Sequence, residues 1–83
     1  MKIRVRYFAS LREALGAGES VEAAEGSTVA HVRDALIARG GAHAQALART
    51  RAVRTALDQT LCDESVAVHD GAELAFFPPV TGG

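Results

Sequence analysis

Large apolar residues alternate with charged ones at the start of the chain. Over residues 2–8, one set of positions holds Ile3, Val5 and Tyr7, and the other holds Lys2, Arg4, Arg6 and Phe8. Because successive side chains of a strand point to opposite faces of a sheet, this period of two predicts a half-buried strand. Phe8 then lies on the polar face, where it interrupts the basic residues.

Helical spacing of apolar residues is clearest between residues 27 and 41. The apolar positions of this segment form one stripe, which consists of Val29, Val32 and Leu36. Ser27 or Thr28 can cap the start of the helix, and Gly40-Gly41 stop it. This segment is therefore expected to be the main helix of the fold.

A short helix is also expected over residues 10–16. Ser10 and Glu13 have the spacing of a capping box, in which each side chain satisfies a backbone N–H at the helix start. Gly16 and Gly18 are expected to end this helix, because glycine adopts positive φ without strain.

The remaining apolar segments predict four more strands and a further short helix. The helix covers residues 42–50, and the strands cover residues 20–25, residues 52–57, a few residues around Val66, and residues 73–77. Turn residues separate the last three strands at Asp58-Gln59 and Asp70-Gly71. This order of elements predicts an α+β fold in which a mixed sheet packs against one main helix. The β-grasp, or ubiquitin-like, fold is one candidate with this order.

Length and charge limit the possible functions. The chain has 83 residues, with nine basic and ten acidic side chains and a net charge of −1. We expect one domain over residues 1–77, followed by an extended tail over residues 78–83. The charge balance argues against nucleic-acid binding, and no apolar run approaches the ~20 residues of a membrane span. Cys62 is the single cysteine, and a signal-peptide pattern is lacking, so the expected location is the cytoplasm.

Candidate catalytic and metal-binding residues are few. The three histidines are His31, His43 and His69. None has a partner at metal-ligand spacing, and His31 is expected on the solvated side of its helix. Cys62 is interpreted as a small residue near the core, and Asp63-Glu64 as a solvated turn. Phosphate-binding and nucleophile-elbow motifs are lacking, so we expect no bound metal or cofactor and no catalysis by the chain alone.

The C-terminal segment reads "AFFPPVTGG" over residues 75–83. Its two prolines lack backbone N–H groups, so the hydrogen-bond ladder of the last strand must end near Phe77. Gly82-Gly83 has no Cβ and can pass through a channel too narrow for other residues. A glycine carboxylate is also unhindered, which suits adenylation followed by replacement of oxygen with sulfur. The alternative is a frayed terminus without a role.

The terminal octet "FFPPVTGG" resembles the C-terminal signature of the small subunits of molybdopterin synthase, a family of ubiquitin-like sulfur carriers. The resemblance continues in "YFASLRE", "LDQTLC" and "DGAELAFFPPVTGG". It covers essentially the whole chain and is loose only over residues 38–52. Asp58 departs from the family pattern, in which Asn commonly precedes the residue equivalent to Gln59. The resemblance implies the β-grasp fold.

For function, the resemblance implies that Gly83 is the reacting residue. An ATP-dependent activating enzyme would adenylate its carboxylate, and a sulfur donor protein would convert it to a thiocarboxylate. The tail would then enter the active site of the large synthase subunit, within a heterotetramer. There it would give sulfur to cyclic pyranopterin monophosphate, two transfers producing the dithiolene of molybdopterin. The other tail residues concerned are Pro78, Pro79, Val80, Thr81 and Gly82.

An interface with partner proteins is expected beside the tail. If Leu74 and Phe76 face the core, Phe77 lies exposed on the opposite face, where Phe8 also lies. Leu61 can complete this patch, since the resemblance implies that the matching positions contact partners. The alternative is that these are ordinary core or incidental surface residues.

Two other functions stay open on the sequence alone. Sulfur carriers of thiamin thiazole synthesis and of tRNA thiolation also end in Gly-Gly, although they generally lack "FFPPVT". A ubiquitin-like protein modifier would instead join its tail to amines.

Overall fold

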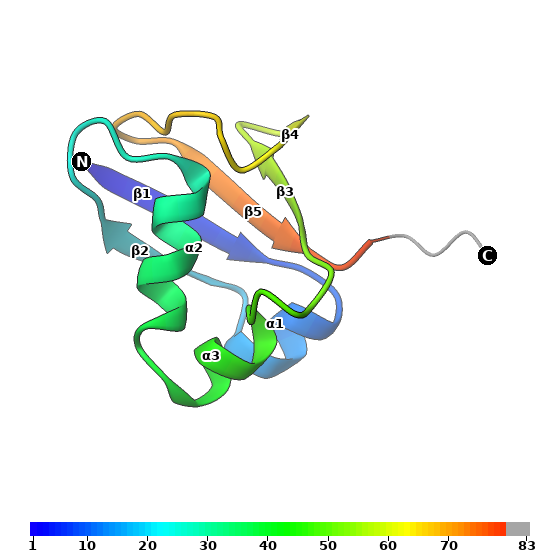
Figure 1. Ribbon diagram of the computed structural model, residues 1–83. Helices are drawn as coiled ribbons and strands as arrows, with labels where there is room; N and C mark the ends of the chain where they lie inside the picture. The colour runs from blue at the N-terminus through cyan, green and yellow to red at the C-terminus, as the bar shows by residue number, and fades with distance from the viewer. Residues whose placement is uncertain (80–83) are drawn as a thin grey trace.

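Five strands form one mixed sheet in the computed structural model of the chain, which describes residues 1–79 (Figure 1). The elements in chain order are β1 (Lys2–Tyr7), α1 (Ser10–Leu15), β2 (Gly18–Glu22), α2 (Val29–Ile37), α3 (Gly41–Ala46), β3 (Arg54–Leu57), β4 (Thr60–Cys62) and β5 (Glu73–Phe77). The strand order in the sheet is β2-β1-β5-β3-β4. The predicted α+β class and main helix are confirmed.

The centre of the sheet is the parallel pair of β1 and β5, and the other pairs are antiparallel. Val5 lies beside Leu74, and Tyr7 lies beside Phe76. A slip of one residue would turn every side chain of a strand to the other face, so this register decides which residues are buried. It places the apolar positions of both central strands on the same face.

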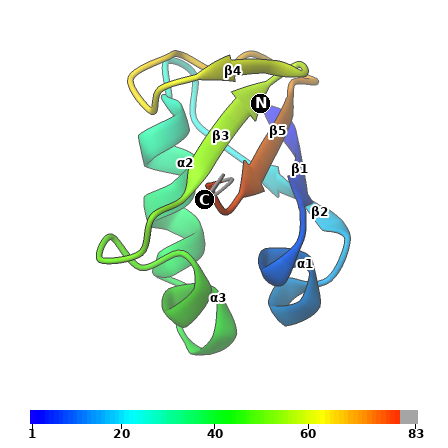
Figure 2. The same ribbon diagram turned by 90° about the vertical axis from the view of Figure 1, so that its right-hand side faces the viewer.

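The core lies between this face and α2, which crosses it on one side (Figure 2). The largest fully buried side chains are Tyr7, Phe76, Ile3, Leu36, Leu47, Leu74, Val5 and Val29. The predicted stripe of α2 is therefore confirmed, and Val32 is buried with it. Arg4 and Arg6 are exposed on the opposite, outer face, as the alternation predicts. None of the helices described over residues 1–79 is long and apolar enough to cross a lipid bilayer.

The start of α2 has the capping box that was expected at the start of α1. Thr28 Oγ1 accepts a hydrogen bond from the backbone N–H of His31 at 3.3 Å, and Nδ1 of His31 accepts one from the backbone N–H of Thr28 at 3.0 Å. The prediction that Ser10 and Glu13 cap α1 is wrong. The N-cap is Ala9, with φ of 53° and no side-chain hydrogen bond, and the carbonyl of Phe8 accepts from Leu11 N at 3.1 Å instead.

Gly16 and Gly18 have different roles. Gly16 has φ of 92° and ends α1, as expected. Gly18 does not end the helix, because it is the first residue of β2. A Cβ at this position would lie 2.3 Å from the carbonyl oxygen of Val5 on the adjacent strand. Glycine is therefore required at position 18 by the close approach of β1, and positive φ is not the reason.

The prediction of a short strand around Val66 is wrong. The short strand is β4, which follows a two-residue turn at Asp58-Gln59 with φ of 49° and 69°. Two consecutive residues with positive φ form a tight hairpin turn, so the strands on either side of it pair directly with each other. Near Val66 there is only an isolated bridge between Thr28 and Ala67. The second strand and α3 also end earlier than expected, at Glu22 and Ala46.

Candidate functional site

The outer face of the sheet, opposite α2, carries the predicted docking residues. Ala56 of β3 pairs with Ala75 of β5 on one side and with Leu61 of β4 on the other. Phe8 extends the β1–β5 pairing by donating its backbone N–H to the carbonyl of Phe76 at 3.1 Å. We call the apolar residues of this face the outer patch, which consists of Phe8, Ala56, Leu61, Ala75 and Phe77. The structure thus places residues from four strands or their ends on one surface.

The outer patch is partly open to solvent. Phe8 is 39% exposed and Leu61 is 65% exposed. Phe77 is half-buried, so the expectation that it lies exposed is wrong. Phe77 lies on β5, and β5 has the neighbouring strands β1 and β3 on its two sides. The small alanines on β3 and β5 leave an open groove of about 460 Å³, lined by Arg6, Phe8, Ala56, Gln59, Glu73, Ala75 and Phe77.

The C-terminal tail begins at the end of the sheet where the two phenylalanines lie. β5 ends at Phe77, and Pro78 and Pro79, both half-buried, continue past it as irregular chain. In Figure 1 this segment leads away from the sheet at the end of β5. The predicted end of the hydrogen-bond ladder is therefore confirmed. The other predicted tail residues, Val80, Thr81, Gly82 and Gly83, lie outside the described residues.

The Asp58-Gln59 turn and the histidine nearest to it are joined by hydrogen bonds. One carboxylate oxygen of Asp58 accepts from the backbone N–H of Glu73 at 3.0 Å, and the other lies 2.6 Å from Nε2 of His69. The backbone hydrogen bond from Glu73 and the contact with His69 lower the pKa of Asp58. The hydrogen bond with Asp58 raises the pKa of His69. Asp58 therefore fastens the β3–β4 turn to the start of β5.

His43 belongs to a second polar cluster, around Glu19 of β2. Oε2 of Glu19 lies 2.8 Å from both Nε2 of His43 and the Tyr7 hydroxyl, and its other oxygen pairs with Arg39. Burial alone would raise the pKa of Glu19, but the hydrogen bonds from Arg39, His43 and Tyr7 outweigh it and hold the pKa at about 2. Burial and the Glu19 contact raise the pKa of Tyr7.

Neither histidine cluster forms a metal site. Among residues 1–79, no group of three or more His, Cys, Asp or Glu side chains is arranged to hold a metal ion. Cys62 is half-buried against the core, as interpreted from the sequence, and its Sγ lies 3.7 Å from Oγ1 of Thr55. The contacts of His43, His69 and Cys62 described here join neighbouring elements of the fold.

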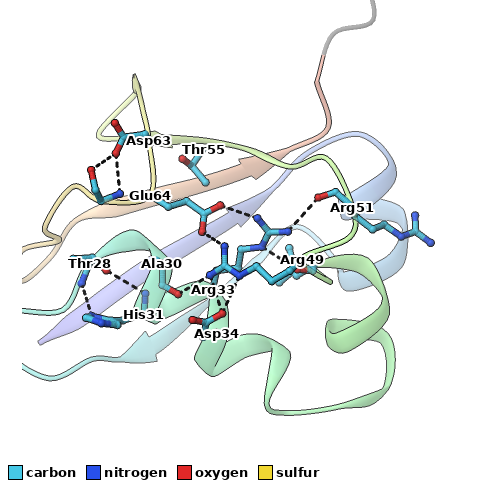
Figure 3. A network of polar contacts seen from close by, with 12 residues as sticks. Thr28, Ala30, His31, Arg33, Asp34, Arg49, Arg51, Thr55, Asp63 and Glu64 are labelled. Carbon is cyan, nitrogen blue, oxygen red and sulfur yellow. Dashed lines mark hydrogen bonds and ion pairs between the residues drawn. The ribbon is translucent and has the colours of Figure 1, made fainter.

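The interpretation of Glu64 as part of a solvated turn is wrong, because it pairs with a buried arginine (Figure 3). Arg33 of α2 is only 4% exposed, and its Nη1 lies 2.7 Å from Oε2 of Glu64. Nε of Arg33 donates to the carbonyl of Leu47 at 2.9 Å, and Nη2 donates to the carbonyls of Ala48 and Arg51 at 2.8 and 3.3 Å. This network fastens the segment after α3 to the main helix, and no local sequence signal points to it.

Comparison with known proteins gives close relatives over the whole chain. The family model described as the ThiS family matches residues 5–83. The molybdopterin synthase sulfur carrier subunit of Escherichia coli (strain K12) is 40% identical over 81 residues, which are 98% of this chain and 99% of that protein. The protein of the same name from Haemophilus influenzae is 38% identical, with the same coverage.

Solved structures agree on the fold. The crystal structure of SAMP1 from Haloferax volcanii has a TM-score of 0.80 at 27% identity and covers both chains completely. A complex of subunits 1 and 2 of the molybdopterin-converting factor from Helicobacter pylori, with a TM-score of 0.71 at 24% identity, also covers both chains completely and shares the fold. The β-grasp expectation is confirmed. The family match over residues 5–83 and the two relatives show that this chain belongs to the ThiS family.

Proposed function

We propose that this chain is the sulfur carrier subunit of a molybdopterin synthase, and that it carries sulfur as a thiocarboxylate at Gly83. The observation that carries the proposal is the 40% identity, over 98% of the chain, with a relative of that name. The outer patch supports it, because it offers a docking surface beside the point where the tail leaves the sheet.

The proposed chemistry starts from a poor electrophile. A terminal carboxylate has a pKa of about 3.3–3.7 and is an anion at neutral pH. Its oxygen attacks the α-phosphate of ATP in the activating enzyme, pyrophosphate leaves, and an acyl-adenylate results. A sulfur nucleophile supplied by a donor protein then displaces AMP and leaves a thiocarboxylate. The chain itself binds no cofactor in this scheme, since the activating enzyme uses the ATP.

The contribution of the fold to this reaction is to position the terminal thiocarboxylate. The six residues from Pro78 to Gly83 reach at most about 20 Å from the end of β5. The domain must therefore bind close to the entrance of the active site of the large subunit, where the thiocarboxylate meets cyclic pyranopterin monophosphate. Contact through the outer patch fixes that distance. Two transfers, from two loaded carriers, produce the dithiolene of molybdopterin.

The proposed partners follow from this sequence of steps. They are the large synthase subunit, in a heterotetramer, the adenylating enzyme and the sulfur donor protein. The Helicobacter pylori structure is described as a complex of subunits 1 and 2, which supports a large-subunit partner for a chain of this fold. We propose that these steps take place in the cytoplasm.

Loading of the chain can be measured directly. Co-expression with the activating enzyme of its host and a sulfur donor is expected to raise the mass of the intact chain by the difference between one sulfur and one oxygen atom. Omission of the activating enzyme is the control and should leave the mass unchanged. A chain that instead becomes joined to amines of other proteins, with no sulfur gain, would contradict the carrier function and favour a protein modifier.

The outer patch is expected to dominate binding to the large subunit. Replacing Phe8 or Leu61 by Ala should weaken binding by about 2 kcal/mol, or roughly 30-fold in Kd, because both expose large apolar side chains within the proposed interface. Val66→Ala is the matched control, since Val66 is 38% exposed but lies on the loop that contacts the start of α2. Titration calorimetry with purified large subunit measures the difference. Equal losses for all three variants would contradict the interface.

A further inference from the structure

Four cations lie on the outer face of the sheet: Lys2, Arg4 and Arg6 on β1, and Arg54 on β3. Two of them have a carboxylate directly opposite on the neighbouring strand. By register, Lys2 lies opposite Glu22 of β2, and Arg4 lies opposite Glu73 of β5. Neither cation forms an ion pair within residues 1–79, because Glu22 pairs with the N-terminal amine and Glu73 pairs with Arg6. Lys2 and Arg4 lie toward the start of β1, at the opposite end of the strand from Phe8.

Arg6 and Arg54 have no carboxylate opposite them. The cross-strand neighbours of Arg6 are Gly18 and Ala75, and the neighbour of Arg54 on β5 is Phe77. Arg6 reaches only diagonally to Glu73, with 3.6 Å between Nη1 and Oε1. The guanidinium of Arg54 forms no ion pair with any of residues 1–79. Within residues 1–79, Arg6 is therefore held by one ion pair at 3.6 Å, and Arg54 by none.

Both arginines adjoin the aromatic residues of the outer patch. The guanidinium carbon of Arg6 lies 5.5 Å from the centroid of the Phe8 ring, within cation–π range. Arg6 also lines the open groove. Arg54 lies across the β3–β5 pair from Phe77. One cation thus stands beside each phenylalanine, on either side of the β5 strand.

We propose that Arg6 and Arg54 bind carboxylate side chains of the large subunit that surround the apolar contact of the outer patch. Arginine suits this role, because its planar guanidinium stacks on an aromatic ring and still donates two parallel hydrogen bonds to a carboxylate. The partner surface then has an apolar side chain for the groove and Asp or Glu residues at its rim. This inference rests on the proposed function, since it concerns the same interface.

Charge pairs at the rim of an interface act mainly on the association rate and on the choice of partner. The test measures association and dissociation of the large subunit with the wild-type chain and with an Arg6→Gln/Arg54→Gln double variant, from about 50 to about 500 mM NaCl. We expect the double variant to associate about tenfold more slowly at low salt. Its affinity should also change less with salt than that of the wild-type chain.

A second double variant provides the matched control. Lys2→Gln/Arg4→Gln removes the same charge from the same face, but at the end of β1 that is remote from the two phenylalanines, and should alter the rate by no more than about twofold. The charge reversal Arg6→Glu/Arg54→Glu should bind better as salt is added, because screening weakens its repulsion from the partner carboxylates.

The outcomes separate this inference from the function on which it rests. If the two Gln double variants slow association equally, only net charge matters and the assignment to Arg6 and Arg54 is overturned. Association that is independent of salt in the wild-type chain overturns it too, while binding and sulfur transfer would still support the proposed function. A wild-type chain that does not bind the large subunit at all overturns both.

Discussion

Deletion of Gly83 is expected to abolish sulfur transfer to cyclic pyranopterin monophosphate and to leave the free energy of unfolding unchanged. The free energy of unfolding should not change, because β5 ends at Phe77 and the buried core consists of residues before the tail. Sulfur transfer should be lost completely, because reacting atoms must approach within about 3–3.5 Å. Loss of one residue withdraws the terminal carbon by up to about 3.6 Å.

This experiment can separate activation from transfer. A deleted chain made chemically as a thiocarboxylate bypasses the activating enzyme, and its conversion of the pterin substrate with the large subunit measures transfer alone. Extension by one residue after Gly83 should be equally inactive, whereas Gly82→Ala should keep part of the activity, since a Cβ only crowds the channel. Urea unfolding checks the fold of each variant. Full conversion by the deleted chain would show that the terminal glycine has no role.

Replacement of Arg33 by Met should have the largest effect on stability, a loss of about 3–5 kcal/mol in the free energy of unfolding. Methionine fills a similar volume but donates no hydrogen bond. The carbonyls of Leu47, Ala48 and Arg51 would lose their donor, and Glu64 would lose its buried arginine partner and keep only Arg49. For a small domain this is a large part of the total stability.

Arg49→Met is the matched control for this prediction. Arg49 belongs to the same network, where it pairs with Asp34 and Glu64, but its side chain is 45% exposed. Ion pairs at the surface contribute about 0–1 kcal/mol, so this variant should unfold at nearly the wild-type urea concentration. Equal destabilisation by the two substitutions would show that the buried position of Arg33 is not what matters.

The difference between these two arginines shows the limit of sequence reasoning for this fold. The period of apolar residues predicts buried faces well. The face of β1 with Ile3, Val5 and Tyr7 is buried as expected, and so is the apolar stripe of α2. Reasoning from this period also treats every charged residue as solvated. Arg33 is buried only because Glu64, which is 31 residues away in the sequence, and three loop carbonyls surround it. Such a set of partners exists only after the chain has folded.

The same reasoning applies to the candidate site. Alternation alone places Phe8 and Phe77 on the outer face, and the two prolines predict where the strand ends. The half-buried state of Phe77 was not predictable, because it depends on β5 being a central strand with neighbours on both sides. Leu61 joins the patch through the register of the β3–β4 hairpin, which the φ angles at Asp58-Gln59 determine.

The parallel pairing of β1 with β5 has a consequence for the timing of synthesis. The first and the last strands of the described fold form the centre of the sheet, so β3 and β4 have nothing to join until β5 is in place. Contacts between residues so distant in sequence close late and slow the folding of a chain. On the ribosome, the sheet therefore cannot close before β5 has emerged. A nascent chain therefore lacks the assembled outer patch, and any protein that binds this patch can select only the completed domain.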